Sequence, residues 1–84
     1  MDAISEPGLS SLIVTLSEIP ATREAALSAL TARSDLSLGD IQERWLPAVL
    51  SSDDPYGAFR ELEALPGVEL VEVVFVELPA AASF

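Results

Sequence analysis

Residues 53–78 read DDPYGAFRELEALPGVELVEVVFVEL, and this stretch decides the fold because it joins a clear helix to a clear strand. An aspartate before Pro55 is typical of a helix start, since its carboxylate accepts hydrogen bonds from free backbone amides and proline already has the helical φ. The helix is expected to continue to Leu65 and to end at Pro66-Gly67. The β-branched run Val68–Leu78 then predicts a strand.

The N-terminal half of the chain carries the reverse order, a strand and then a helix. In residues 9–17, Leu12, Val14 and Leu16 alternate with other side chains, which is the period of a half-buried strand. Residues 21–33 are rich in Ala, Leu and Glu, which favour a helix. One side of this helix is expected to face a sheet, because apolar positions recur at spacings of three and four; that side holds Arg23, Ala26, Leu27 and Leu30.

Two further strands are predicted between the helices. One begins with Leu36-Ser37-Leu38 and extends at most to Gln42, and the other covers Trp45–Ser52. Pro47 is unusual in a strand because it cannot donate a hydrogen bond, so we expect a bulge or a later start there. The order strand, helix, strand, strand, helix, strand predicts an α+β, ferredoxin-like βαββαβ sandwich, in which two helices cover one face of a four-stranded antiparallel sheet.

Residues 9–78 are expected to form this single domain, between a flexible lead-in (1–8) and a flexible tail (79–84).

The last predicted strand also indicates which sheet face the helices cover. A carboxylate at the centre of a strand would be costly beneath packed helices, so Glu72 is expected to point away from them. The alternation then assigns Val71, Val73 and Phe75 to the core, and places the other set on the uncovered face: Val68, Leu70, Glu72, Val74, Val76 and Leu78. In the first strand, Ser11, Ile13 and Thr15 are expected on that same face.

The uncovered face is too apolar to meet only water, and such patches usually mark an interaction surface. The candidate binding residues surround Glu72, and they are Ile13, Thr15, Trp45, Val49, Leu70, Glu72, Val74 and Val76. Two kinds of occupant remain open at this point: a foreign ligand, or a second copy of the chain in a homodimer.

Composition excludes several function classes. The 84 residues include 14 Asp and Glu against 4 Arg, with no Lys, His or Cys, for a net charge of −10. Nucleic acid and anionic lipid attract clusters of basic residues, so neither is an expected partner of this acidic chain. The expected partner is basic. Without histidine or cysteine the chain lacks the common catalytic bases, thiolates and soft-metal ligands, so we expect no enzyme activity, no metal site and no cofactor.

We expect a cytoplasmic protein with no insertion into a membrane. The N-terminal segment Met1–Glu6 is acidic where a secretory signal would be basic. The longest purely apolar run in the sequence is Val73–Val76, far shorter than the roughly 20 residues of a membrane span.

Three stretches together resemble the NapD family: Ser11–Thr15, Asp53-Asp54 before the second helix, and Leu65–Phe75. NapD proteins are small cytoplasmic chaperones for the catalytic subunit of periplasmic nitrate reductase. The resemblance implies the same sandwich fold and binding of the partner's twin-arginine signal peptide on the sheet, which holds back export until the molybdenum cofactor is inserted. A basic, apolar signal peptide would suit an acidic chain with an apolar sheet face.

Two alternatives to this function stay open. One is a regulatory module that dimerises through the sheet, with or without a small ligand at the interface. The other is a structural protein-interaction module for an unrelated basic partner.

Overall fold

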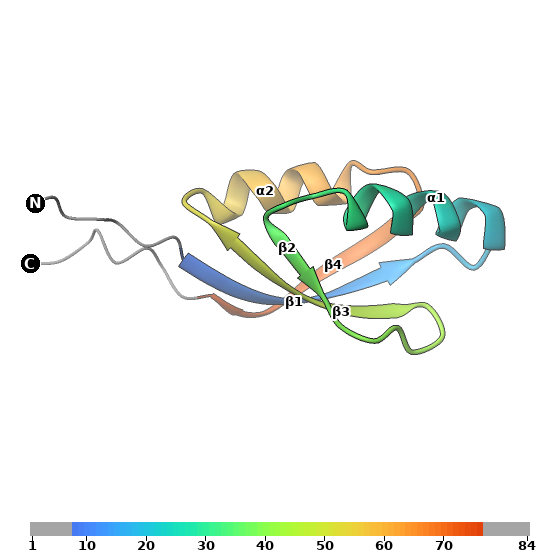
Figure 1. Cartoon of the computed structure of the whole chain (residues 1–84), viewed down its shortest axis with the longest axis horizontal. Helices are drawn as coiled ribbons and strands as arrows, with labels where there is room; N and C mark the ends of the chain where they lie inside the picture. The colour runs from blue at the N-terminus through green and yellow to red at the C-terminus, as the bar shows by residue number, and fades with distance from the viewer. Residues whose placement is uncertain (1–7, 77–84) are drawn as a thin grey trace, which may run out of the picture.

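The computed structural model describes residues 8–76, which fold in the order βαββαβ (Figure 1). The elements are β1 (Gly8–Leu16), α1 (Pro20–Thr31), β2 (Leu36–Leu38), β3 (Trp45–Ser52), α2 (Pro55–Glu63) and β4 (Val68–Val76). The strands form one antiparallel sheet in the order β2-β3-β1-β4. Both helices lie on the same side of it (Figure 1). The predicted ferredoxin-like α+β sandwich is confirmed.

The predicted lead-in and tail cannot be compared with the structure. Residues 1–7 and 77–84 lie outside the described residues, as do Glu77 and Leu78 of the predicted last strand. Gly8, predicted as part of the lead-in, is instead the first residue of β1.

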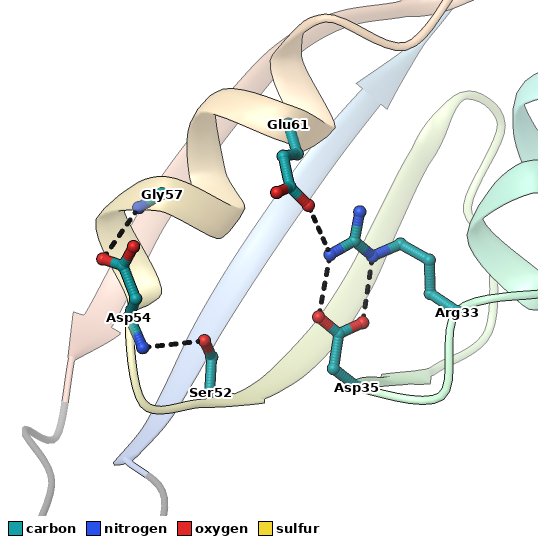
Figure 2. A network of polar contacts seen from close by, with 6 residues as sticks. All are labelled: Arg33, Asp35, Ser52, Asp54, Gly57 and Glu61. Atoms are coloured by element: carbon teal, nitrogen blue, oxygen red, sulfur yellow. Dashed lines mark hydrogen bonds and ion pairs between the residues drawn. The ribbon is translucent and has the colours of Figure 1, made fainter.

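Helix α2 begins as its sequence indicates, but it ends at Glu63, two residues before the predicted Leu65. The Asp54 carboxylate accepts a hydrogen bond from the Gly57 backbone N–H at 3.1 Å (Figure 2), and Pro55 is the first helical residue. After the helix, Gly67 has a φ of +90°, a conformation that side chains other than hydrogen disfavour. A Cβ at Gly67 would also lie 2.5 Å from the Thr22 carbonyl oxygen of α1, so both the turn and the close packing require glycine.

The core lies between the helices and the sheet. From β1 it takes Leu12, Val14 and Leu16, as the alternation predicts, and the helices contribute Leu30 and Leu62. Each of these five side chains is at most 1% exposed. These side chains belong to one core cluster, to which each helix contributes only a few apolar residues.

Two register shifts in β4 overturn part of the predicted alternation. Glu72 pairs with Ile13 and Val71 with Val14, so Glu72 points away from the helices and Val71 is buried, as predicted. A shift then leaves Val74 without a partner on β1, and this reverses which side the following residues face. The predicted core position of Phe75 is therefore wrong, since this side chain pairs with Ser11 and is 59% exposed.

Val76 and Val68 are corrected for the same reason. Val76 pairs with Ser10 and packs against the core, so its predicted place on the uncovered face is wrong. Val68 pairs with Leu16 and also packs against the core, because a second shift leaves Glu69 unpaired. Val73 pairs with the buried Leu12 but is itself 43% exposed at the sheet edge, so it is not the core residue that the alternation predicts.

Pro47 lies within β3 without a bulge, because it stands where the ladder to β2 has ended. Its carbonyl oxygen accepts a hydrogen bond from the Gly39 N–H at 2.8 Å. The backbone nitrogen and oxygen of one strand residue point to the same side, so the nitrogen of Pro47 also faces the β2 side. The last ladder pair of β2 is Leu38 with Ala48, one step earlier. No β2 residue therefore needs a hydrogen bond from the backbone nitrogen of Pro47. Strand β2 ends at Leu38 and does not reach Gln42. Gln42 forms only an isolated bridge with Trp45.

A cluster of charged side chains joins the end of α1 to α2. The Arg33 guanidinium donates two hydrogen bonds to the Asp35 carboxylate, at 2.9 and 2.8 Å, and a third to Glu61 at 3.1 Å (Figure 2). The bond from Arg33 lowers the pKa of Asp35, and the same contact raises the pKa of Arg33. This cluster fastens the α1–β2 loop to the second helix and lies on the helical side of the molecule.

Candidate functional site

We call the side of the sheet that faces away from α1 and α2 the open face. Its residues follow from the strand register, which aligns them in three rows across β3, β1 and β4. The rows are Trp45–Thr15–Leu70, Pro47–Ile13–Glu72 and Val49–Ser11–Phe75. Neither described helix covers these rows (Figure 1).

Large apolar side chains on the open face are accessible to a ligand. The exposed fractions are 44% for Trp45, 41% for Val49, 49% for Leu70 and 66% for Val74. Leu46, Leu50 and Val14 on the helical side of the sheet are at most 2% exposed, so the exposure of leucine and valine here reflects the absence of a second layer over this face. An apolar surface that is continuous over several strands is typical of an interaction site.

Thr15 is the exception among the predicted contact residues of this face. It is only 6% exposed, because it lies in the row between the larger Trp45 and Leu70. Thr15 can therefore support its neighbours, but it offers almost no surface to a ligand. Val76 offers no open-face contact either, since it packs against the core.

A shallow groove of about 400 Å³ crosses the open face. Small residues at its floor and rim, Ser11, Ser37 and Gly39, leave a depression between bulkier neighbours. The bulkier lining comes from four strands and consists of Ile13, Pro47, Val49 and Val74 together with Leu38 and parts of Leu12 and Ala48. We call this depression the apolar groove.

The sequence prediction missed several lining residues of the apolar groove. Pro47 alternates with Trp45 and Val49 along β3, so the period of two could have placed it on this face. Ser37 and Gly39 are small and carry no functional signal in the sequence. Phe75 lies on the open face outside this lining, and the sequence could not predict that position, because the register shift that exposes it does not change the alternation.

Glu72 provides a negative charge at the edge of the apolar groove. It pairs with the groove residue Ile13 and is exposed. Within residues 8–76, no arginine forms an ion pair with it. An exposed carboxylate of this kind can accept a bidentate pair of hydrogen bonds from a guanidinium group.

A second hollow, of about 510 Å³, lies at the hairpin between β2 and β3, and Glu18, Arg23, Glu43, Arg44 and Trp45 line it. Arg44 donates to Glu18 at 2.6 Å and to Glu69 at 3.2 Å, and its guanidinium lies 5.9 Å from the centre of the Trp45 ring. Glu43 has a φ of +60° in the hairpin turn, which is an uncommon backbone conformation for a residue with a side chain.

The structure therefore brings together six of the eight predicted contact residues. Ile13, Trp45, Val49, Leu70, Glu72 and Val74 share the open face, whereas Thr15 is buried and Val76 points to the other side. Across residues 8–76, no group of three or more acidic side chains is arranged to hold a metal ion. Neither of the two described helices is long and apolar enough to cross a membrane.

Comparisons with known proteins add no assignment. No family model matches the sequence, and no curated protein or solved structure matches the chain. The resemblance to the NapD family therefore stays a prediction from the sequence, and the open face has to be interpreted from its own chemistry.

Proposed function

We propose that this protein is a NapD-like cytoplasmic chaperone that binds the twin-arginine signal peptide of a nitrate reductase precursor, or of a related molybdoenzyme precursor, on its open face. Binding would delay export of the precursor until its cofactor has been inserted. The observation that supports this proposal best is the apolar groove beside Glu72, on a sheet face that neither described helix covers.

The chemistry of such a peptide suits both parts of the site. A signal peptide of this kind has a basic end and an apolar stretch. Burial of the apolar stretch against Ile13, Val49 and Val74 would provide most of the affinity, at about 25 cal/mol per Å² of apolar surface removed from water. An arginine at Glu72 would add a charge-assisted contact that orients the peptide.

Charge favours a basic partner over a second copy of the chain. Each copy carries a net charge of −10, so two copies repel one another. A symmetric antiparallel pairing of two β4 edges about Glu72 would place these two carboxylates opposite each other, which destabilises a sheet. Light scattering at micromolar concentration distinguishes a peptide-binding monomer from a homodimer. We expect a monomer, and a tight dimer that buries the open face would contradict the proposal.

The proposal includes no catalytic step. The sequence has no histidine, lysine or cysteine that could serve as base or nucleophile. The cofactor would belong to the precursor, and this chain would need none of its own.

Isothermal titration calorimetry with a synthetic twin-arginine peptide tests the proposal. We expect saturable binding that weakens as salt is added, because part of the affinity comes from exposed charges. Glu72→Lys should weaken binding by about tenfold, since it replaces an attraction by a repulsion at the groove edge.

Glu63→Lys is the matched control, because it makes the same charge change on exposed α2, away from the open face. Absence of saturable binding would contradict the proposal. Equal losses for the two variants would also contradict it, because the net charge alone would then explain the attraction.

A further inference from the structure

The open face is not uniform along the strands, and its two ends differ in chemistry. The apolar groove extends from the middle row, at Ile13 and Pro47, toward the end where β1 begins and β3 ends, at Val49. The opposite end, where β1 ends and the β2–β3 hairpin turns, carries Trp45 and Leu70. We call this second region the hairpin end.

Carboxylates gather at the hairpin end. Glu18 follows β1, Glu43 is in the hairpin turn, and Glu69 lies at the start of β4. Arg44 pairs with both Glu18 and Glu69, yet the Glu18 side chain remains 79% exposed and that of Glu69 48%. Since an ionised carboxylate has about four acceptor positions, each of these two can accept further hydrogen bonds from a ligand.

Arg44 illustrates how this end can hold a guanidinium group. Its own guanidinium contacts two carboxylates and lies near the face of the Trp45 indole ring. The Trp45 side chain is still 44% exposed, so part of the indole remains available to a second cation. Carboxylates and an aromatic ring are groups that a positively charged partner residue binds, and the lining of the apolar groove contains neither.

From this asymmetry we infer that the peptide binds in one direction along the strands, with its basic end at the hairpin end and its apolar stretch in the apolar groove. The inference rests on the proposed function and adds a direction to it. Glu72 is in the middle row of the face, where it pairs with the groove residue Ile13. The partner is thus a segment whose arginines lie beside its apolar stretch and not within it.

Paramagnetic relaxation enhancement measures this direction. The probe is a synthetic peptide with two adjacent arginines followed by an apolar stretch, carrying a nitroxide label at one end or the other, added to the ¹⁵N-labelled full chain. We expect the label on the basic end to broaden the amide signals of Trp45 and Leu70 most. The label on the apolar end should broaden those of Ser37 and Val49 most.

A pair of charge-neutralising variants provides an independent readout. The double variant Glu18→Gln/Glu43→Gln should weaken binding by about fivefold, as expected for the loss of exposed ion pairs. Glu24→Gln/Glu63→Gln removes the same charge from exposed positions on the two helices and should change the affinity by less than twofold.

The outcomes separate the direction from the function. If the peptide binds but the basic-end label broadens Ser37 and Val49, or both labels broaden both ends equally, the inferred direction is wrong and the proposed function stands. If neither labelled peptide shows saturable binding, the proposed function fails and the direction fails with it.

Discussion

The two faces of the sheet are built from the same kinds of residue but have opposite surroundings. On the helical face, Leu50 of β3 is fully buried, whereas on the open face its neighbour Val49 is 41% exposed. The helical face is thus used for stability and the open face is free for binding. A protein that needed only to fold would place polar residues on the open face, as half-solvated antiparallel sheets commonly do. The difference supports the proposal that the apolar open face binds a partner.

The largest expected effect comes from comparing the same leucine-to-alanine substitution at one position on each face. Leu50→Ala removes a fully buried side chain and should lower the free energy of unfolding by about 3 kcal/mol. Leu70→Ala, at an open-face leucine that is 49% exposed, should lower it by less than about 1 kcal/mol and weaken peptide binding instead.

Urea denaturation and calorimetry check this pair. Similar losses of stability for the two variants would contradict the distinction between a stabilising face and a binding face.

Two glycines allow a second comparison, with an intermediate effect. Gly67→Ala combines a φ of +90° with a Cβ 2.5 Å from the Thr22 carbonyl oxygen, and should cost about 2 kcal/mol of stability. Gly39→Ala places its Cβ 3.5 Å from Pro47, an ordinary contact, so stability should change by less than about 0.5 kcal/mol.

Gly39 also lines the apolar groove, so the added methyl group should reduce peptide affinity while the fold is retained. Thermal melts together with peptide titration give both quantities. Tight binding by Gly39→Ala would show that the peptide does not enter the groove.

The smallest expected effect concerns the charged cluster on the helical side. Asp35→Asn removes the bidentate contact with Arg33 and should cost about 1 kcal/mol near neutral pH, because the pair is only partly buried. Since Arg33 lowers the pKa of Asp35 in the folded state, the contribution of this carboxylate is present above its unfolded pKa and is lost as the pH falls through its folded value.

The difference in unfolding free energy between the wild type and Asp35→Asn should therefore shrink below about pH 4. Urea denaturation at several pH values measures it, with the exposed Asp53→Asn as control. Peptide binding should not change in either variant, and a loss of binding in Asp35→Asn would place the cluster in the site.

The sequence was sufficient for the order and type of all six elements, because each has its own local signal. The helix start at Asp54-Pro55, the glycine at Gly67 and the alternation in β1 are such signals, and the structure confirms each. Alternation also places Glu72 on the open face correctly, since a buried unpaired carboxylate would be too costly.

The sequence was insufficient where pairing between strands decides the outcome. The positions of Phe75 and Val76 depend on a register shift opposite β1, and a β-branched strand accommodates such a shift without any change in its own pattern. The burial of Thr15 depends on the sizes of Trp45 and Leu70 in neighbouring strands. Both errors therefore concern contacts between elements and not the elements themselves.

Mapping of chemical-shift changes in the ¹⁵N-labelled protein, as a twin-arginine peptide is added, tests the central claim most directly. We predict saturable changes on the open face, at Ile13, Val49, Glu72 and Val74, and little change at α1 and α2. Changes concentrated on the helices, or none at saturating peptide, would contradict the claim that the open face is the binding surface.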